Sequence, residues 1–122
     1  MAYFFDTYAI IELINKNPPY ERFKSFNLVT SILNIGEVYG IFLREGGKEK
    51  ADDWFKEFNC DLIEITPKII VEAVHFRFIH KGKNISLVDS VGYILAQENN
   101  IKFLTGDSYF ENRDNVEFVK KD

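Results

Sequence analysis

Short apolar segments alternate along this sequence with longer segments in which apolar residues recur at helical spacing. Strands that alternate with helices predict a parallel sheet covered by helices on both faces. We therefore expect an α/β fold with a central parallel sheet of about four to five short strands flanked by helices. The strand candidates are residues 2–5, 27–29, 62–65, 102–104 and 116–119.

Capping residues, proline and glycine mark the helix boundaries. Thr30 or Ser31 can cap the helix over 31–44, and Ser86 can cap the last helix, where Asp89 would complete a capping box. Gly46-Gly47 is expected to end the first of these helices, because glycine readily takes the positive φ that a helix end favours. The expected helices cover residues 7–15, 18–26, 31–44, 48–58, 67–80 and 87–98. The helix over 48–58 is amphipathic, with Ala51, Trp54, Phe55 and Phe58 on its apolar stripe.

The chain has 122 residues, of which 46% are hydrophobic and 16% aromatic, so it can bury a real core. No linker-like tract divides it, and we expect a single domain over residues 1–122. The single cysteine, Cys60, excludes an intrachain disulfide framework or a multi-cysteine zinc site and fits a reducing compartment. The sequence shows no signal peptide and no apolar run of about 20 residues, so we expect a cytoplasmic protein that does not cross a membrane.

Four carboxylates stand in mainly apolar segments that are far apart in the sequence: Asp6, Glu37, Asp89 and Asp107. An ionised carboxylate is costly to remove from water unless charges or hydrogen bonds compensate it. If the fold brings the four together, they repel one another, and a divalent cation held by oxygen ligands is the natural remedy. Their charges equal the formal net charge of −4, so the acidic composition does not exclude a phosphodiester substrate bound with the help of a metal.

Asp6 and Asp107 each follow a short apolar strand. In a parallel sheet the carboxyl ends of the strands lie along one edge, and ligands bind in the crevice there. Both side chains are therefore expected in the same cleft. Turn formation or helix capping is the alternative role for either residue alone, because Asp favours both.

Glu37 and Asp89 lie on expected helices that are apolar over most of their circumference. Such helices are largely buried, so a narrow polar stripe faces either a cleft or a slot of solvent. Gly36 and Gly40 flank Glu37 and would allow another backbone to approach closely. The alternatives are a solvated stripe for Glu37 and N-terminal capping for Asp89, and capping is compatible with metal binding.

Four segments carry a resemblance to a known family: Phe4-Phe5-Asp6-Thr7, Asn34-Ile35-Gly36-Glu37-Val38-Tyr39-Gly40, Ser86-Leu87-Val88-Asp89-Ser90 and Leu104-Thr105-Gly106-Asp107-Ser108-Tyr109-Phe110. Together, in this order and over this length, they resemble the PIN-domain nucleases, and most closely the small VapC-type toxins of prokaryotic toxin–antitoxin pairs. Many relatives have Ser after the Asp-Thr of the first motif, where this chain has Tyr8.

The resemblance implies a parallel α/β fold, an acidic pocket that holds Mg²⁺ or Mn²⁺, and endoribonuclease activity on RNA. It also implies a homodimer and a cognate antitoxin that would insert a helix or an extended tail into the cleft. By motif, the catalytic and metal-binding residues would be Asp6, Glu37, Asp89 and Asp107, of which Asp6 and Asp107 would be the most direct ligands. The supporting hydroxyls would be Thr105 and Ser86.

The sequence specifies substrate contacts only weakly. Arg44, Lys81 and Lys83 are candidates for contacts with RNA phosphates, and ordinary surface charge is their alternative role. In some relatives a further acidic residue follows the last motif, a place that Asp114 or Glu111 could take.

Three other functions are compatible with parts of this pattern. An RNA-processing PIN-like nuclease without a toxin role would share every feature, and only a neighbouring antitoxin gene would separate the two. A non-catalytic interaction module would keep the fold, but the complete set of carboxylates counts against it. A phospho-acceptor receiver domain needs paired acids after an early strand, whereas here Thr7 follows Asp6.

Overall fold

The computed structural model of the protein describes residues 2–81 and 84–121. Its described residues form a five-stranded sheet in the order β3-β2-β1-β4-β5, in which every neighbouring pair of strands is parallel. The α/β fold predicted from the alternation is therefore confirmed. The strands are β1 (Ala2–Phe5), β2 (Asn27–Thr30), β3 (Asp61–Leu62), β4 (Lys102–Thr105) and β5 (Val116–Phe118).

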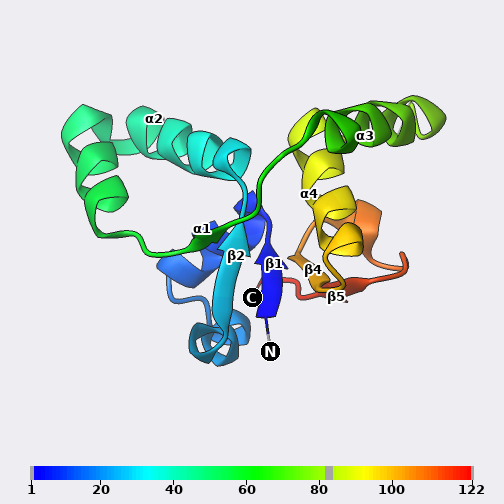
Figure 1. The fold of residues 1–122 in the computed structure, drawn as a ribbon. Helices are drawn as coiled ribbons and strands as arrows, with labels where there is room; N and C mark the ends of the chain where they lie inside the picture. Colours follow the sequence, from blue (N-terminus) through cyan, green and yellow to red (C-terminus); the bar gives the residue numbers. More distant parts are fainter. Residues whose placement is uncertain (1, 82–83, 122) are drawn as a thin grey trace.

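Helices pack on both sides of the sheet, with α1 and α2 to one side and α3 and α4 to the other (Figure 1). The two helices predicted over 31–44 and 48–58 join into α2, which is interrupted at Gly47 by a φ of 82° and a ψ of −177°. No helix within the described ranges is long and apolar enough to span a bilayer. The helices are α1 (Thr7–Ile14), the 3-10 helix η1 (Pro18–Ser25), α2 (Ile32–Glu57), α3 (Pro67–Ile79), α4 (Leu87–Glu98) and the 3-10 helix η2 (Ser108–Phe110).

The central strand β1 supplies aromatic side chains to both faces of the sheet. Tyr3 and Phe5 belong to the core formed with α1, η1 and α2, while Phe4 belongs to the core formed with α3 and α4. This division follows from the alternation of side chains along a strand. Phe4 stacks on Phe103 with ring centroids 5.9 Å apart. A Cβ on Gly92 would lie 2.8 Å from the Phe4 ring, so glycine lets α4 pack directly on these rings.

Two sequence-based expectations differ from the structure on the α2–β3 side. The strand expected over 62–65 pairs only at Asp61–Leu62. The N–H of Ile63 still donates to the carbonyl of Thr30 at 3.0 Å, but the chain then leaves the sheet edge, and the side chains of Ile63 and Ile65 pack against the α3–α4 core. Phe55, which the helical pattern placed on a buried stripe, is 59% exposed, since the face that meets Phe42 is centred on Trp54.

The close approach expected at the α2 glycines is also wrong. A Cβ added to Gly36 would meet nothing within 4 Å, and one added to Gly40 would meet only the side chain of Arg44, at 3.7 Å. The Gly36 face of α2 is open to solvent, so no other backbone in the described structure uses the space that these glycines leave.

Candidate metal centre

Three neighbouring strands end at the same edge of the sheet and deliver polar residues there. Asp6 follows β1, Ser31 follows β2, and Gly106-Asp107 follows β4. Since these strands are parallel, α1, α2 and η2 all begin at this edge, which is where ligands bind in open α/β sheets. Figure 1 shows the N-terminal ends of α2 and α4 above the same edge.

Asp6 is the most buried of the four candidate carboxylates, with 2% of its surface exposed. It caps α1, because its Oδ1 accepts a hydrogen bond from the backbone N–H of Ala9 at 2.7 Å, and its Oδ2 accepts one from the hydroxyl of Thr105. Burial raises the pKa of Asp6 to about 8, and repulsion from Asp89 and Asp107 acts in the same direction against the two hydrogen bonds. Asp6 is thus a buried carboxylate that lacks a compensating positive charge in the described structure.

Thr105 connects the ends of β1 and β4. Its hydroxyl donates to Asp6 and accepts a hydrogen bond from the backbone N–H of Asp107 at 3.0 Å. Asp107 in turn caps η2, since its Oδ1 accepts from the N–H of Tyr109 at 3.0 Å. The capping roles considered for Asp6 and Asp107 are therefore both present, and they fix the two carboxylates on either side of one threonine.

Glu37 is held by a chain of hydrogen bonds that links α1 and α2. Its Oε1 accepts from the hydroxyl of Thr7 at 2.5 Å, and the same hydroxyl accepts from Nδ2 of Asn34 at 3.2 Å. Asn34 is buried and its Oδ1 accepts from the hydroxyl of Ser31 at 2.7 Å. Sequence reasoning missed this role of Thr7, for which the only available signal was its place beside Asp6 in the first motif.

Asp89 lies in the first turn of α4, where the predicted capping box with Ser86 is present. The backbone N–H of Asp89 donates to the Ser86 hydroxyl at 3.0 Å, and Oδ2 of Asp89 accepts from the N–H of Ser86 at 3.5 Å. Burial raises the pKa of Asp89, and repulsion from Asp107 and Glu37 raises it further while Ser86 opposes the change. The four carboxylates therefore act on one another electrostatically, although they come from four separate elements.

The donor set fits a hard divalent cation in chemistry and charge, because it consists of carboxylate oxygens that form no ion pair with any described basic side chain. Within residues 2–81 and 84–121, however, no three acidic, histidine or cysteine side chains are close enough together to hold a metal ion as they stand. Each carboxylate is instead turned toward its own local donor. The carboxylates would have to turn toward one another to share an ion.

A comparison with profiles of protein families identifies the family of the chain that forms this site. The profile of the PIN domain matches residues 3–116. The chain belongs to the PIN-domain family. No curated protein matches the sequence at a significant level.

Three solved structures share the PIN fold of this chain over nearly their whole length. A toxin–antitoxin complex from Klebsiella pneumoniae has a TM-score of 0.75 and 18% identity, and the match covers 98% of this chain and 99% of that one. The sarcin–ricin loop-cleaving toxin VapC20 of Mycobacterium tuberculosis has a TM-score of 0.73 and 19% identity, with 98% of each chain covered. VapBC2 from Rickettsia felis, bound to a DNA fragment from its promoter, has a TM-score of 0.75 and 20% identity, with 100% of each chain covered.

Tyr8, which stands where many PIN relatives have serine, packs against the last motif. A Cβ on Gly106 would lie 2.1 Å from the Tyr8 ring, so the ring occupies the space that glycine leaves. The Tyr8 hydroxyl accepts a hydrogen bond from the backbone N–H of Lys121 at 3.3 Å. The Tyr8 side chain therefore connects α1 with the β4–η2 loop and with the C-terminal segment beside the carboxylates.

Of the basic residues proposed to contact substrate, Arg44 and Lys81 form no ion pairs with the described carboxylates. Arg44 is exposed and folds back along α2, and Lys81 is exposed at the end of α3. No described carboxylate lies within ion-pair distance of either, while Lys83 lies outside the described residues. Glu111 and Asp114 are both exposed.

Proposed function

We propose that this protein is a Mg²⁺- or Mn²⁺-dependent endoribonuclease that hydrolyses RNA phosphodiester bonds, and that it is the toxin of a type II toxin–antitoxin pair. The observation that carries the proposal is the burial of Asp6 at the carboxyl edge of a PIN-domain sheet, where Asp89 and Asp107 repel it and where Glu37 and Asp107 repel Asp89. The structural likeness to a toxin that cleaves the sarcin–ricin loop supports the choice of RNA as substrate.

In this proposal Asp6 and Asp107 are the most direct metal ligands, and Glu37 and Asp89 complete the site directly or through water. A divalent cation held by these carboxylates would supply Lewis-acid chemistry, which would lower the pKa of water and stabilise charge on the leaving oxygen. Thr105 holds Asp6 and the backbone of Asp107 at a fixed separation. Thr7 orients Glu37, which would help to align the attacking water.

The same proposal includes a homodimer and a cognate antitoxin, and it places the protein in the cytoplasm. One of the similar structures is a toxin–antitoxin complex by its own description, and another is VapBC2 bound to a DNA fragment from its promoter. An antitoxin that inserts a basic residue among the carboxylates would compensate the buried charge of Asp6. An adjacent antitoxin gene would separate this role from that of an RNA-processing nuclease.

The proposal predicts cleavage of a mixed RNA pool by purified protein with Mg²⁺ or Mn²⁺ and none with EDTA. Asp6→Asn and Asp89→Asn should reduce the rate by at least about a hundredfold, since even outer-shell partners of metal ligands contribute about 10–100-fold. Asp53→Asn is the matched control, because it removes one carboxylate from the exposed surface of α2. Full metal-dependent cleavage by folded Asp6→Asn would refute the site, and no cleavage by antitoxin-free wild type would favour a binding module.

A further inference from the structure

A pocket of about 710 Å³ lies between the second half of α3 and the segment that leads into α4. Its polar lining consists of Arg77, His80, Lys81 and Asn84, and the described lining contains no acidic side chain. Phe78 and Leu87 contribute to its apolar wall. The pocket is therefore locally basic on a chain whose net charge is −4.

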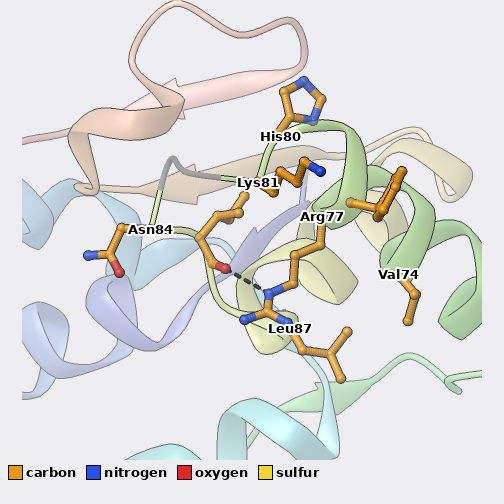
Figure 2. A pocket seen from close by; sticks show the side chains of 8 residues that line it. Val74, Arg77, His80, Lys81, Asn84 and Leu87 are labelled. Carbon is orange, nitrogen blue, oxygen red and sulfur yellow. Dashed lines mark hydrogen bonds between the residues drawn. The ribbon is translucent and has the colours of Figure 1, made fainter.

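Arg77 is fixed in an orientation suited to binding an anion. Its Nε donates a hydrogen bond to the backbone carbonyl of Ile85 at 2.9 Å, and Figure 2 shows the side chain reaching toward this carbonyl with its guanidinium beside Leu87. No described carboxylate is within ion-pair distance of Arg77, so its terminal N–H groups have no anionic partner there. A guanidinium that is already oriented loses little entropy when it binds a phosphate through two parallel hydrogen bonds.

Lys81 and Phe78 add a second cation and an aromatic surface to the same pocket. The Lys81 ammonium lies 5.0 Å from the centroid of the Phe78 ring, and Phe78 is 65% exposed. Lys81 also lacks an ion pair within the described part of the chain. Cations beside an exposed aromatic ring are the combination with which proteins bind single-stranded nucleic acids, because phosphates meet the charges and bases stack on the ring.

The pocket is joined through the backbone to the candidate metal centre. Ile85, which accepts the Arg77 hydrogen bond, directly precedes Ser86, and Ser86 caps the helix that carries Asp89. An RNA strand held by Arg77 would therefore lie against the segment that precedes the helix carrying Asp89. An acidic peptide would also satisfy the two cations, but it would make no use of the exposed Phe78 ring beside them.

We propose that this pocket binds single-stranded RNA, with Arg77 and Lys81 contacting a phosphate and Phe78 contacting the neighbouring base. The inference rests on the proposed ribonuclease function, of which it names a substrate subsite. It adds Arg77 and Phe78, which sequence reasoning did not single out, to Lys81.

The test is the affinity of a short, fluorescein-labelled single-stranded RNA of randomised sequence, measured by anisotropy in EDTA so that binding is separated from cleavage. Arg77→Gln and Lys81→Gln should each weaken binding by about tenfold and lower the slope of log affinity against log salt by about 0.7. Lys102→Gln is the matched control, because Lys102 is exposed at the start of β4, on the opposite edge of the sheet from the carboxylates.

Equal affinities for Arg77→Gln, Lys81→Gln and Lys102→Gln would overturn the proposal. So would Arg77-dependent binding of a polyglutamate peptide that exceeds the binding of RNA, since the pocket would then be a peptide site. Because Arg77→Gln also removes the donor to Ile85, Lys81→Gln keeps the test valid if the Arg77 variant does not fold. Arg77-dependent binding without cleavage by wild type would reject the nuclease function alone, whereas cleavage with unchanged binding by the variants would reject the pocket alone.

Discussion

At the scale of single residues, hydroxyl groups organise the candidate metal centre. Thr105 bridges Asp6 and the backbone of Asp107, and Thr7 connects Glu37 to the buried side chain of Asn34. A hydroxyl suits this task because it donates to a carboxylate while it accepts from a neighbouring N–H. Both threonines therefore fix acidic side chains without adding charge.

Thr7→Val should lower the kcat for RNA cleavage by about tenfold and leave KM nearly unchanged, because it removes the donor to Glu37 without touching a substrate contact. The variant also leaves Nδ2 of Asn34 without its acceptor, so we expect a loss of about 1–3 kcal/mol of stability. Steady-state kinetics and urea unfolding measure the two effects. Thr7→Ser restores the hydroxyl and should recover both, and a Ser variant as slow as the Val variant would show that the methyl group matters instead.

At the scale of helices and strands, sequence patterns located most elements, and tertiary packing decided the rest. The capping residues Ser31 and Ser86 and the break at Gly47 could be predicted, because caps and positive φ are local features. The early end of β3 could not, since Ile65 has the same apolar character whether it pairs in a sheet or packs against the α3–α4 core. The hydrogen bond from Thr7 to Glu37 could not be predicted either, because it joins two residues that are 30 positions apart and lie on different helices.

The two kinds of glycine in α2 should respond oppositely to alanine. Gly47→Ala should cost about 1–3 kcal/mol, because a residue with a Cβ is strained at a φ of 82° and a ψ of −177°, a combination that is essentially restricted to glycine. Gly36→Ala should stabilise the protein by about 0.5–1 kcal/mol, since Gly36 occupies an exposed position of the helix and an added Cβ meets nothing within 4 Å. Urea unfolding without metal measures both, and each variant serves as the other's control. A loss of stability in Gly36→Ala would mean that the open face of α2 is packed in solution.

At the scale of the whole molecule, the candidate centre is assembled from β1, α2, α4 and the loop after β4. The alternation of strands and helices was enough to predict a parallel sheet, and the parallel sheet was enough to place Asp6 and Asp107 at one edge. Strand order and the basic pocket beside α4 were beyond the sequence, because both depend on how distant elements pack. Because Asp6 is buried at this edge of the sheet, its protonation and any metal that it binds change the stability of the entire fold.

The stability of the metal-free protein should fall as pH rises from about 4 to about 8. The pKa of Asp6 is about 8 in the folded protein against an ordinary value of 3.8, so within this range the folded state keeps a proton that the unfolded chain has released. The slope from Asp6 is at most about 1.4 kcal/mol per pH unit, and the raised pKa of Asp89 acts in the same direction. Asp6→Asn should show a shallower slope and exceed wild type in stability near pH 8 in EDTA.

A divalent cation should reverse this pH dependence, because it binds the deprotonated carboxylates of the folded protein. Its binding therefore stabilises the folded state at the pH at which the ionised carboxylates destabilise the metal-free protein. Mg²⁺ should raise the melting temperature of wild type more at about pH 8 than at about pH 5, and raise that of Asp6→Asn much less. Asp53→Asn removes one exposed charge and controls for the general effect of net charge on the melting temperature. An Asp6→Asn protein that is less stable than wild type at about pH 8 in EDTA would mean that Asp6 serves as a structural cap before it serves a metal.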